Sequence, residues 1–240
     1  MSISKPLTHN HRRHGREHER IEMRTNLPDY DTPELLAEWN IALATLTRIG
    51  ELGVERAMGV ATRRMIFQVL RAMGAVDVLD IGTCFGTSAC TMALAECNVV
   101  TVDARPVNGT KGSWRKHGRP RDAKTLMELA GVNDRVAFVT ADSVKYMRGT
   151  DRLFDFISID GGHRMQHVYE EIILAQKCLK SNGLIFLDDV QVDLTGGFTP
   201  IHGPRMAIER HIAEGAPLRV IHFAKTMYGE PTGVAFLVAK

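Results

Sequence analysis

The sequence has few of the features that mark metal-finger, secreted, membrane or nucleic-acid-binding proteins. Its four cysteines form no Cys-x-x-Cys pair, which argues against a zinc site or a disulfide framework. No apolar run approaches the roughly 18 to 20 residues of a membrane span, and the N-terminus is polar where a signal peptide would be apolar. The net charge is only +2, so no overall field favours nucleic acid or a membrane surface. We therefore expect a cytoplasmic globule of enzyme size with no nucleic-acid or membrane partner.

The N-terminal part of the chain divides into two regions. Residues 1–26 are rich in histidine and arginine and almost free of apolar side chains, which predicts a disordered tail, with metal or an acidic partner as the alternative role. Residues 27–73 contain two helical stretches, the first with Pro33 in a favourable first position after Thr32. This second region is expected to be a helical cap over the sheet edge or a dimer surface, and a homo-oligomer is expected.

Residues 74–240 alternate regularly between strand and helix patterns. Such alternation predicts right-handed βαβ crossovers, a mostly parallel sheet and one α/β domain. The last two predicted strands, 218–223 and 234–238, are joined too closely for a crossover helix, so we expect an antiparallel hairpin at one edge. The other predicted strands are 75–81, 99–102, 136–140, 154–159 and 184–187, and the predicted helices are 86–96, 123–130, a short one after 142, 166–179 and 205–214.

A glycine turn and an aspartate suggest a nucleoside site at the first two strands. Gly82 and Gly86 have a Gly-x-x-x-Gly spacing, unlike the Gly-x-Gly-x-x-Gly of dinucleotide binders, and would let backbone approach a ligand at a helix start. Asp103 ends the second strand 23 residues after Asp80, where a carboxylate can accept both ribose hydroxyl protons. The predicted contacts in these segments are Asp80, Gly82, Thr83, Cys84, Phe85, Gly86, Ser88, Asp103 and Ala104.

Over about residues 60–240 the chain resembles class I S-adenosylmethionine (SAM) methyltransferases, on this glycine spacing and the terminal hairpin. The resemblance implies a Rossmann-like, seven-stranded sheet of order 3-2-1-4-5-7-6, with an antiparallel last strand and helices on both faces. It implies SAM as cofactor. It also places Asp142 and Ser143 at the adenine edge, and Asp160 among the cofactor contacts.

Three carboxylates are expected to converge beside this site. Asp160 ends the fourth strand, and Asp188 and Asp189 end the fifth, which is adjacent in the implied order. Their mutual repulsion would be relieved by a hard divalent cation, so Mg²⁺ is the natural ligand, with Ca²⁺ or Mn²⁺ as substitutes. The alternative is that Asp160 holds a usual acidic position and the Asp188–Asp189 pair caps a loop.

This arrangement resembles metal-dependent O-methyltransferases of the catechol and caffeoyl-CoA type, and more closely those that methylate sugar and polyketide hydroxyls. The resemblance implies a cation held by the three aspartates and a small hydroxylated acceptor. His163 stands where the catechol-type enzymes carry a lysine, so it is a candidate base beside Asp160, with a structural or outer-shell role as the alternative. The acid that sugar-modifying relatives often carry two residues after the metal aspartate is replaced by Gly162.

Two loops are candidate walls of an acceptor site. The basic loop 104–121 is either a flap that favours an anionic acceptor or a solvated surface loop. The loop 191–204 follows the aspartate pair and offers Phe198 and His202 as acceptor contacts.

The competing functions are a metal-independent SAM methyltransferase and a non-catalytic SAM-fold partner subunit. The absence of an (Asn/Asp)-Pro-Pro-Tyr motif counts against methylation of DNA or protein-amide amino groups.

Overall fold

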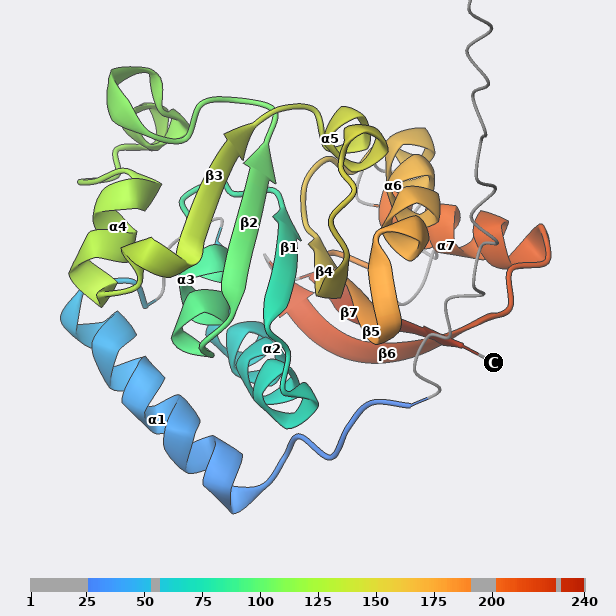
Figure 1. Ribbon diagram of the computed structural model, residues 1–240, viewed down its shortest axis with the longest axis horizontal. Coiled ribbons are helices and arrows are strands. Elements are labelled where there is room, and N and C mark those ends of the chain that lie inside the picture. The colour runs from blue at the N-terminus through green and yellow to red at the C-terminus, as the bar shows by residue number, and fades with distance from the viewer. Residues whose placement is uncertain (1–25, 53–56, 191–201, 228–229, 240) are drawn as a thin grey trace, which may run out of the picture.

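Seven strands form one sheet in the order β3-β2-β1-β4-β5-β7-β6 (Figure 1). The computed structural model describes residues 26–52, 57–190, 202–227 and 230–239, so the predicted tail lies outside them except for Asn26. Strands β1 to β5 pair in parallel, and β7 is antiparallel to both β5 and β6, which confirms the predicted sheet. The strands are β1 Asp77–Ile81, β2 Asn98–Asp103, β3 Val136–Thr140, β4 Phe154–Ile159, β5 Leu179–Leu187, β6 Leu218–Met227 and β7 Glu230–Ala239.

Strand β5 begins five residues earlier than the predicted start at residue 184. The segment after Leu179 contains Asn182 and Gly183, which predict a turn, and Asn182 has a left-handed φ of 62°. The sheet absorbs this segment as an irregularity, because the pairing with β4 shifts register between Phe154 and Phe156. The predicted loop is therefore the first part of the strand.

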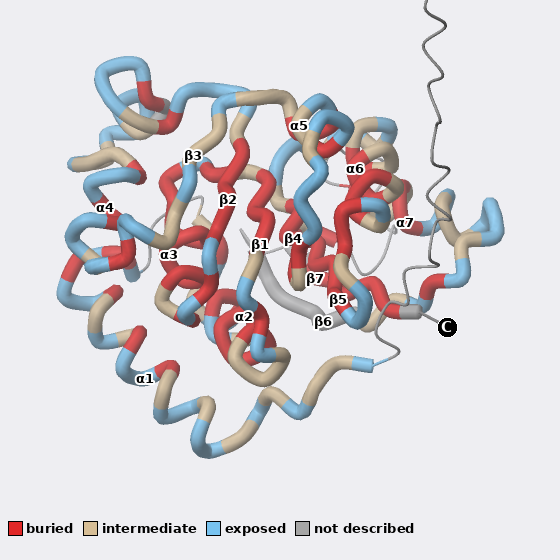
Figure 2. The backbone as a smooth tube through the Cα atoms, in the orientation of Figure 1, coloured by how far each residue is buried: buried red, intermediate tan, exposed pale blue. Residues whose placement is uncertain are grey.

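Helices cover both faces of the sheet and divide the core into two layers. One layer packs α1, α2 and α3 against Phe156, Phe186 and Phe236, whose ring centroids lie 5.2 to 6.4 Å apart. The other packs α5, α6 and α7 against the opposite sides of the same strands, as the alternation of a strand requires. Strands β1 and β4 are buried over most of their length (Figure 2). The helices are α1 Pro33–Arg48, α2 Val60–Met73, α3 Thr87–Leu94, α4 Ala123–Ala130, α5 Ser143–Gly149, α6 Met165–Lys177 and α7 Gly203–Ala213.

The predicted helical cap contributes directly to the first core layer. Thr32 caps α1 by accepting a hydrogen bond from the Leu35 amide (3.3 Å), and Trp39 of α1 packs edge-on against Phe67 of α2 at 5.6 Å.

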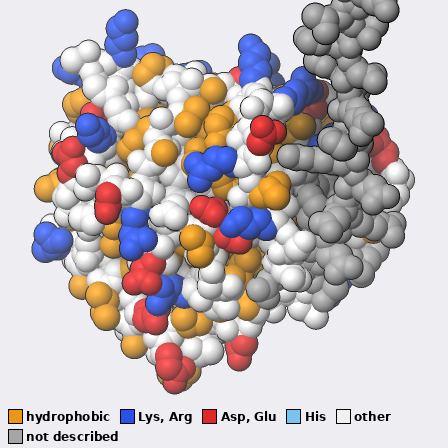
Figure 3. All heavy atoms as spheres, in the orientation of Figure 1, with side chains coloured by type: hydrophobic (Ala, Val, Ile, Leu, Met, Phe, Trp, Pro, Cys, Tyr) orange, Lys and Arg blue, Asp and Glu red, His pale blue; other side chains and the backbone are white. Residues whose placement is uncertain are grey.

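Among the described residues, no helix combines the length and apolar content needed to cross a bilayer. Acidic and basic side chains are interspersed over the coloured part of the face in Figure 3.

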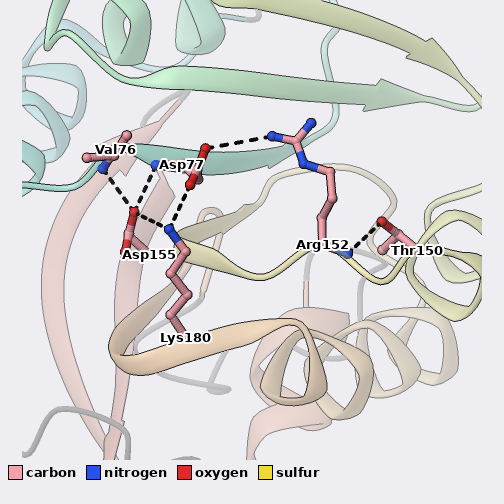
Figure 4. Close-up of polar contacts among 6 residues, drawn as sticks. All are labelled: Val76, Asp77, Thr150, Arg152, Asp155 and Lys180. Atoms are coloured by element: carbon pink, nitrogen blue, oxygen red, sulfur yellow. Dashed lines mark hydrogen bonds and ion pairs between the residues drawn. The ribbon is translucent and has the colours of Figure 1, made fainter.

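A partly exposed ion network ties the amino ends of β1, β4 and β5 together (Figure 4). Asp155 Oδ2 accepts hydrogen bonds from the amides of Val76 (2.9 Å) and Asp77 (2.8 Å), and from Lys180 Nζ (3.1 Å). Lys180 Nζ also lies 2.7 Å from Asp77 Oδ2. Burial acts to raise the pKa of Asp155, but the two amides and Lys180 outweigh it and hold that pKa below its ordinary value.

Candidate functional site

A cavity of about 1040 Å³ opens at the carboxyl ends of the parallel strands. This is the edge where open α/β sheets bind ligands. Ten of the predicted site residues line it: Gly82, Cys84, Asp103, Ala104, Asp142, Ser143, Asp160, His163, Asp188 and Asp189. Part of the predicted cofactor contacts and the carboxylates expected to hold a cation therefore share one cavity.

The glycine turn after β1 is needed for close packing as much as for a ligand. Gly82 has a φ of 102°, and a Cβ there would lie 2.1 Å from the backbone oxygen of Asp160. Gly86 has a φ of 82°, and a Cβ there would lie 2.8 Å from the Cβ of Ala123 in α4. A side chain at either position would push the turn out of place, so both glycines hold the turn against its neighbours.

Asp80 lies beneath the turn and does not line the cavity. It is fully buried between β1, β2 and α3, and its Oδ2 accepts hydrogen bonds from Thr101 (2.8 Å) and Ser88 (3.2 Å). Since the Thr101 hydroxyl donates to Asp80, the Thr83 hydroxyl donates to Thr101, at 2.7 Å. Burial raises the pKa of Asp80 to about 7, against the two hydroxyl donors.

Five of the seven contacts predicted in the glycine turn lie outside the cavity lining. Phe85 is also buried, and its ring packs edge-on against His117 at 5.5 Å. Asp80, Thr83 and Ser88 belong to the buried hydrogen-bond network with Thr101, whereas the Phe85 ring also carries Arg119 of the basic loop 5.3 Å from its centroid. The predicted contacts that lie outside the cavity lining are Asp80, Thr83, Phe85, Gly86 and Ser88.

Asp103 at the end of β2 is held in place by backbone amides. Its Oδ2 accepts from the Cys84 amide (3.0 Å) and its Oδ1 from the Arg105 amide (2.9 Å). A carboxylate has about four acceptor positions, so each oxygen retains capacity for a ribose hydroxyl. Desolvation and the nearby carboxylates of Asp103 and Asp160 raise the pKa of the Cys84 thiol to about 11, so it stays protonated at neutral pH.

Asp142 and Ser143 follow β3 at the far end of the same cavity. Asp142 is the N-cap of α5, and its Oδ1 accepts from the Lys145 amide at 2.9 Å. The Ser143 hydroxyl reaches across to helix α6, where it meets His167 and Glu171. Neither α6 residue was predicted, although their i, i+4 spacing puts both on one face of that helix.

A compact group of possible cation ligands lies at the ends of β4 and β5. The ligand atoms of Asp160, His163 and Asp189 all lie within 4.8 Å of one another. His163 Nε2 is 3.1 Å from Asp189 Oδ2, and Asp189 adopts a left-handed φ of 52°. The loop of His163 is held by α7, because a Cβ on Gly203 would lie 1.7 Å from the His163 backbone oxygen.

This group differs from the predicted aspartate trio in one member. Asp188 lines the cavity but is not in the group, and its Oδ1 accepts a hydrogen bond from the Asp189 amide at 2.9 Å. Successive side chains of a regular strand point to opposite faces, so Asp188 and Asp189 could not both reach one point from a straight strand end. The left-handed turn at Asp189 brings that side chain to Asp160 and His163.

Comparison with known proteins shows a similarity to methyltransferases. A family model described as a methyltransferase domain matches residues 79–190, which contain the glycine turn, Asp103 and the Asp160, His163 and Asp189 group. This part of the chain therefore resembles a methyltransferase domain. A search of curated proteins finds no match.

Several solved structures share the fold of this chain. They include an O-methyltransferase from Bacillus cereus in complex with SAH (22% identity, TM-score 0.60, 86% of this chain and 90% of that chain). Cofactor-bound Rv0187 from MTB has 20% identity and a TM-score of 0.62 over 90% of this chain and 99% of that one. The O-methyltransferase TomG from Streptomyces achromogenes, in complex with SAM, has 17% identity and a TM-score of 0.60 over 84% and 89%.

The basic loop 104–121 lies partly in the cavity wall and is partly exposed. It contains the short 3₁₀ helices η1 Gly109–Lys111 and η2 Ser113–His117 and is pinned by Arg119, whose Nη2 lies 2.6 and 2.7 Å from the buried Glu51 carboxylate. Burial raises the pKa of Glu51 although Arg119 opposes the shift. Ala104, Arg105 and His117 line the cavity, whereas Lys111, Arg115 and Lys116 are exposed.

The second predicted acceptor wall is only partly described. Phe198 lies outside the described residues, and His202 is buried at 1% exposure and is not among the lining residues. Met58 and Gly59, before α2, line the cavity without having been predicted. A sequence pattern does not reveal them, because they reach the site through the packing of α2 on the sheet.

Proposed function

We propose that this protein transfers the methyl group of SAM to a hydroxyl oxygen of a small molecule, with the help of a divalent cation such as Mg²⁺. One observation carries the proposal. Asp160, His163 and Asp189 converge in the same cavity as Asp103. Two structural neighbours are O-methyltransferases, which supports oxygen as the acceptor atom.

The cofactor would be held along the ends of β1, β2 and β3. Asp103, already fixed by two amides, offers its remaining acceptor capacity to the ribose hydroxyls. The turn at Gly82 leaves room for the amino-acid part, and the Asp142 and Ser143 end takes the base. In this order the sulfonium end of the cofactor would lie toward β4, next to Asp160.

The donor set at β4 and β5 fits a hard or borderline divalent cation. Asp160 and Asp189 supply carboxylate oxygens, and His163 supplies an imidazole nitrogen within the same 4.8 Å group. Mn²⁺ or Ca²⁺ could replace Mg²⁺. When bound, such an ion lowers the pKa of an acceptor hydroxyl and orients it. Asp188, which lines the cavity beside Asp189, would complete the negative charge around it.

His163 can serve as a ligand or as the base that takes the acceptor proton, with Asp189 orienting its ring through the 3.1 Å contact. Calorimetry with Mn²⁺ separates the two roles. Weaker Mn²⁺ binding by His163→Ala would identify a ligand. Unchanged Mn²⁺ binding with a lower turnover rate would identify a base.

The test of the function is turnover. The protein is incubated with SAM and a panel of sugars, phenols and polyketide-like alcohols, and methylated product is measured by mass spectrometry with Mg²⁺ or with a chelator. We expect product that requires the cation. SAM binding without any methylated product would overturn the reading as an enzyme of this class and favour a non-catalytic partner subunit.

A metal-independent methyltransferase is the second candidate, because the His163 and Asp189 pair forms a hydrogen bond that needs no cation. In that case Asp189 would orient His163 as a base and the ion would be dispensable. Equal turnover in chelator and in Mg²⁺ would select this candidate.

A further inference from the structure

Three polar side chains meet in the cavity wall where helices α5 and α6 contact each other. The Ser143 hydroxyl donates to Glu171 Oε1 at 2.5 Å. His167 Nε2 lies 3.1 Å from Ser143 Oγ and 3.2 Å from the same Glu171 oxygen. All three residues line the cavity beside Asp142.

The arrangement does not fit a serine hydrolase relay. In such a relay the histidine uses one ring nitrogen for the serine and the other for the carboxylate. Here the single nitrogen Nε2 of His167 faces both Ser143 and Glu171. The serine and the histidine therefore hold one oxygen of the glutamate in place.

Glu171 is unusual in its combination of burial and remaining acceptor capacity. Its side chain is 0% exposed, and its Oε2 has no hydrogen-bond partner among the described residues. Burying a carboxylate oxygen without a donor is costly, so such an atom in a cavity wall calls for a donor from a ligand. The hydrogen bond to Glu171 raises the pKa of His167, which favours a positive charge beside Oε1.

The position of the group determines which part of a ligand it would meet. With the ribose at Asp103, the base of the cofactor extends toward Asp142 and Ser143, where Glu171 lines the wall. The edge of adenine carries an exocyclic amino group, which is a donor, whereas a 6-oxopurine carries a carbonyl oxygen there. An ionised carboxylate only accepts hydrogen bonds, so it suits the amine and repels the carbonyl.

We propose that Glu171, held by Ser143 and His167, accepts a hydrogen bond from the exocyclic amino group of the cofactor and restricts the methyl donor to 6-aminopurine nucleosides. The inference rests on the proposed function only for the placement of SAM. It makes Glu171 a specificity residue on helix α6, distinct from the residues after β2 and β3 that the family resemblance predicts.

The test compares two ligands that differ only at this edge, S-adenosylhomocysteine and S-inosylhomocysteine, by calorimetry. The wild-type protein is expected to prefer the adenosyl ligand by at least about 30-fold, the size of one buried hydrogen bond to a charged group. Glu171→Gln, whose amide can donate as well as accept, is expected to bring the ratio below about 5-fold. Glu170→Gln, on the neighbouring position where the side chain pairs with Arg148, is the matched control and should keep the wild-type ratio.

Each outcome decides the inference. An unchanged ratio in folded Glu171→Gln, or a wild-type protein that binds both ligands equally, would overturn it. If Glu171→Gln does not fold, Ser143→Ala takes its place, and a ratio lowered at least about threefold supports the inference while an unchanged one overturns it. Binding of neither ligand by the wild-type protein would instead overturn the placement of SAM, which is a failure of the proposed function.

Discussion

The two edges of the sheet use aspartates for opposite purposes. At the amino edge, Asp77 and Asp155 are paired with Lys180, whose ammonium lies within 3.1 Å of both carboxylates. At the carboxyl edge, Asp103 and Asp142 are held by backbone amides and Asp189 by a histidine. Backbone amides hold carboxylates at both edges, since Asp155 also accepts from the amides of Val76 and Asp77. The difference is the lysine, which neutralises the carboxylates at the amino edge, whereas amides alone leave the charge and further lone pairs for a ligand. The same residue type therefore stabilises the fold at one edge and lines the cavity at the other.

The largest expected effect is at the cofactor end of the carboxyl edge. Asp103→Ala removes both ribose acceptors, and SAM affinity should fall about 10³-fold, as expected for two hydrogen bonds to a charged group. Calorimetry with SAM measures it. Asp77→Asn, at the opposite edge, is the control and should bind SAM normally. Tight SAM binding by Asp103→Ala would mean that the two edges do not differ as described.

A change at Asp189 should separate binding from catalysis. Asp189→Ala removes a member of the 4.8 Å group, so turnover should fall about 10²-fold or more while SAM affinity stays within about threefold. Steady-state rates and calorimetry on the same preparation check both parts. A fully active Asp189→Ala would remove this residue from the mechanism.

Asp80 tests whether a buried carboxylate beneath the site carries charge. Because its pKa is raised from 3.8 to about 7 in the folded protein, the folded state keeps a proton that the unfolded state releases. Stability should therefore fall as pH rises from about 4 toward 7, by about 3 kcal/mol at pH 6 from this group. Asp80→Asn keeps an oxygen for Thr101 and Ser88 and should lack this fall. Denaturant unfolding of both proteins at several pH values measures the difference, and parallel curves would contradict the raised pKa.

The smallest effect is expected at the amino edge. Asp155→Asn weakens the contacts with Lys180 and two amides, so the free energy of unfolding should drop by about 1 to 2 kcal/mol at neutral pH. Because the pKa of Asp155 is lowered, this contribution is present above the ordinary value of 3.8 and is lost as pH falls through the folded value. Urea unfolding at pH 7 and below pH 3 tests it. An accompanying loss of SAM affinity would contradict the separation between a stabilising amino edge and a ligand-binding carboxyl edge.

Sequence patterns predicted the architecture well because the signals are local or follow from topology. Alternating strands and helices require right-handed crossovers, and the short final connection requires a hairpin. Both features appear as the order β3-β2-β1-β4-β5-β7-β6 with β7 antiparallel. The start of β5 was mispredicted, because Asn182 and Gly183 favour a turn and only pairing with β4 keeps that segment in the sheet.

The same distinction between local sequence signals and tertiary packing applies to the site residues. The end of each strand locates Asp103, Asp142 and Asp160 at one edge from chain order alone, since parallel strands deliver their carboxyl ends together. Side-chain direction does not follow from chain order. Burial between β1, β2 and α3 turns Asp80 away from the cavity, and a left-handed backbone brings Asp189 to His163. Glu171 and Met58 reach the cavity because α6 and α2 pack against the sheet, and contacts between elements distant in sequence leave no periodic pattern to read.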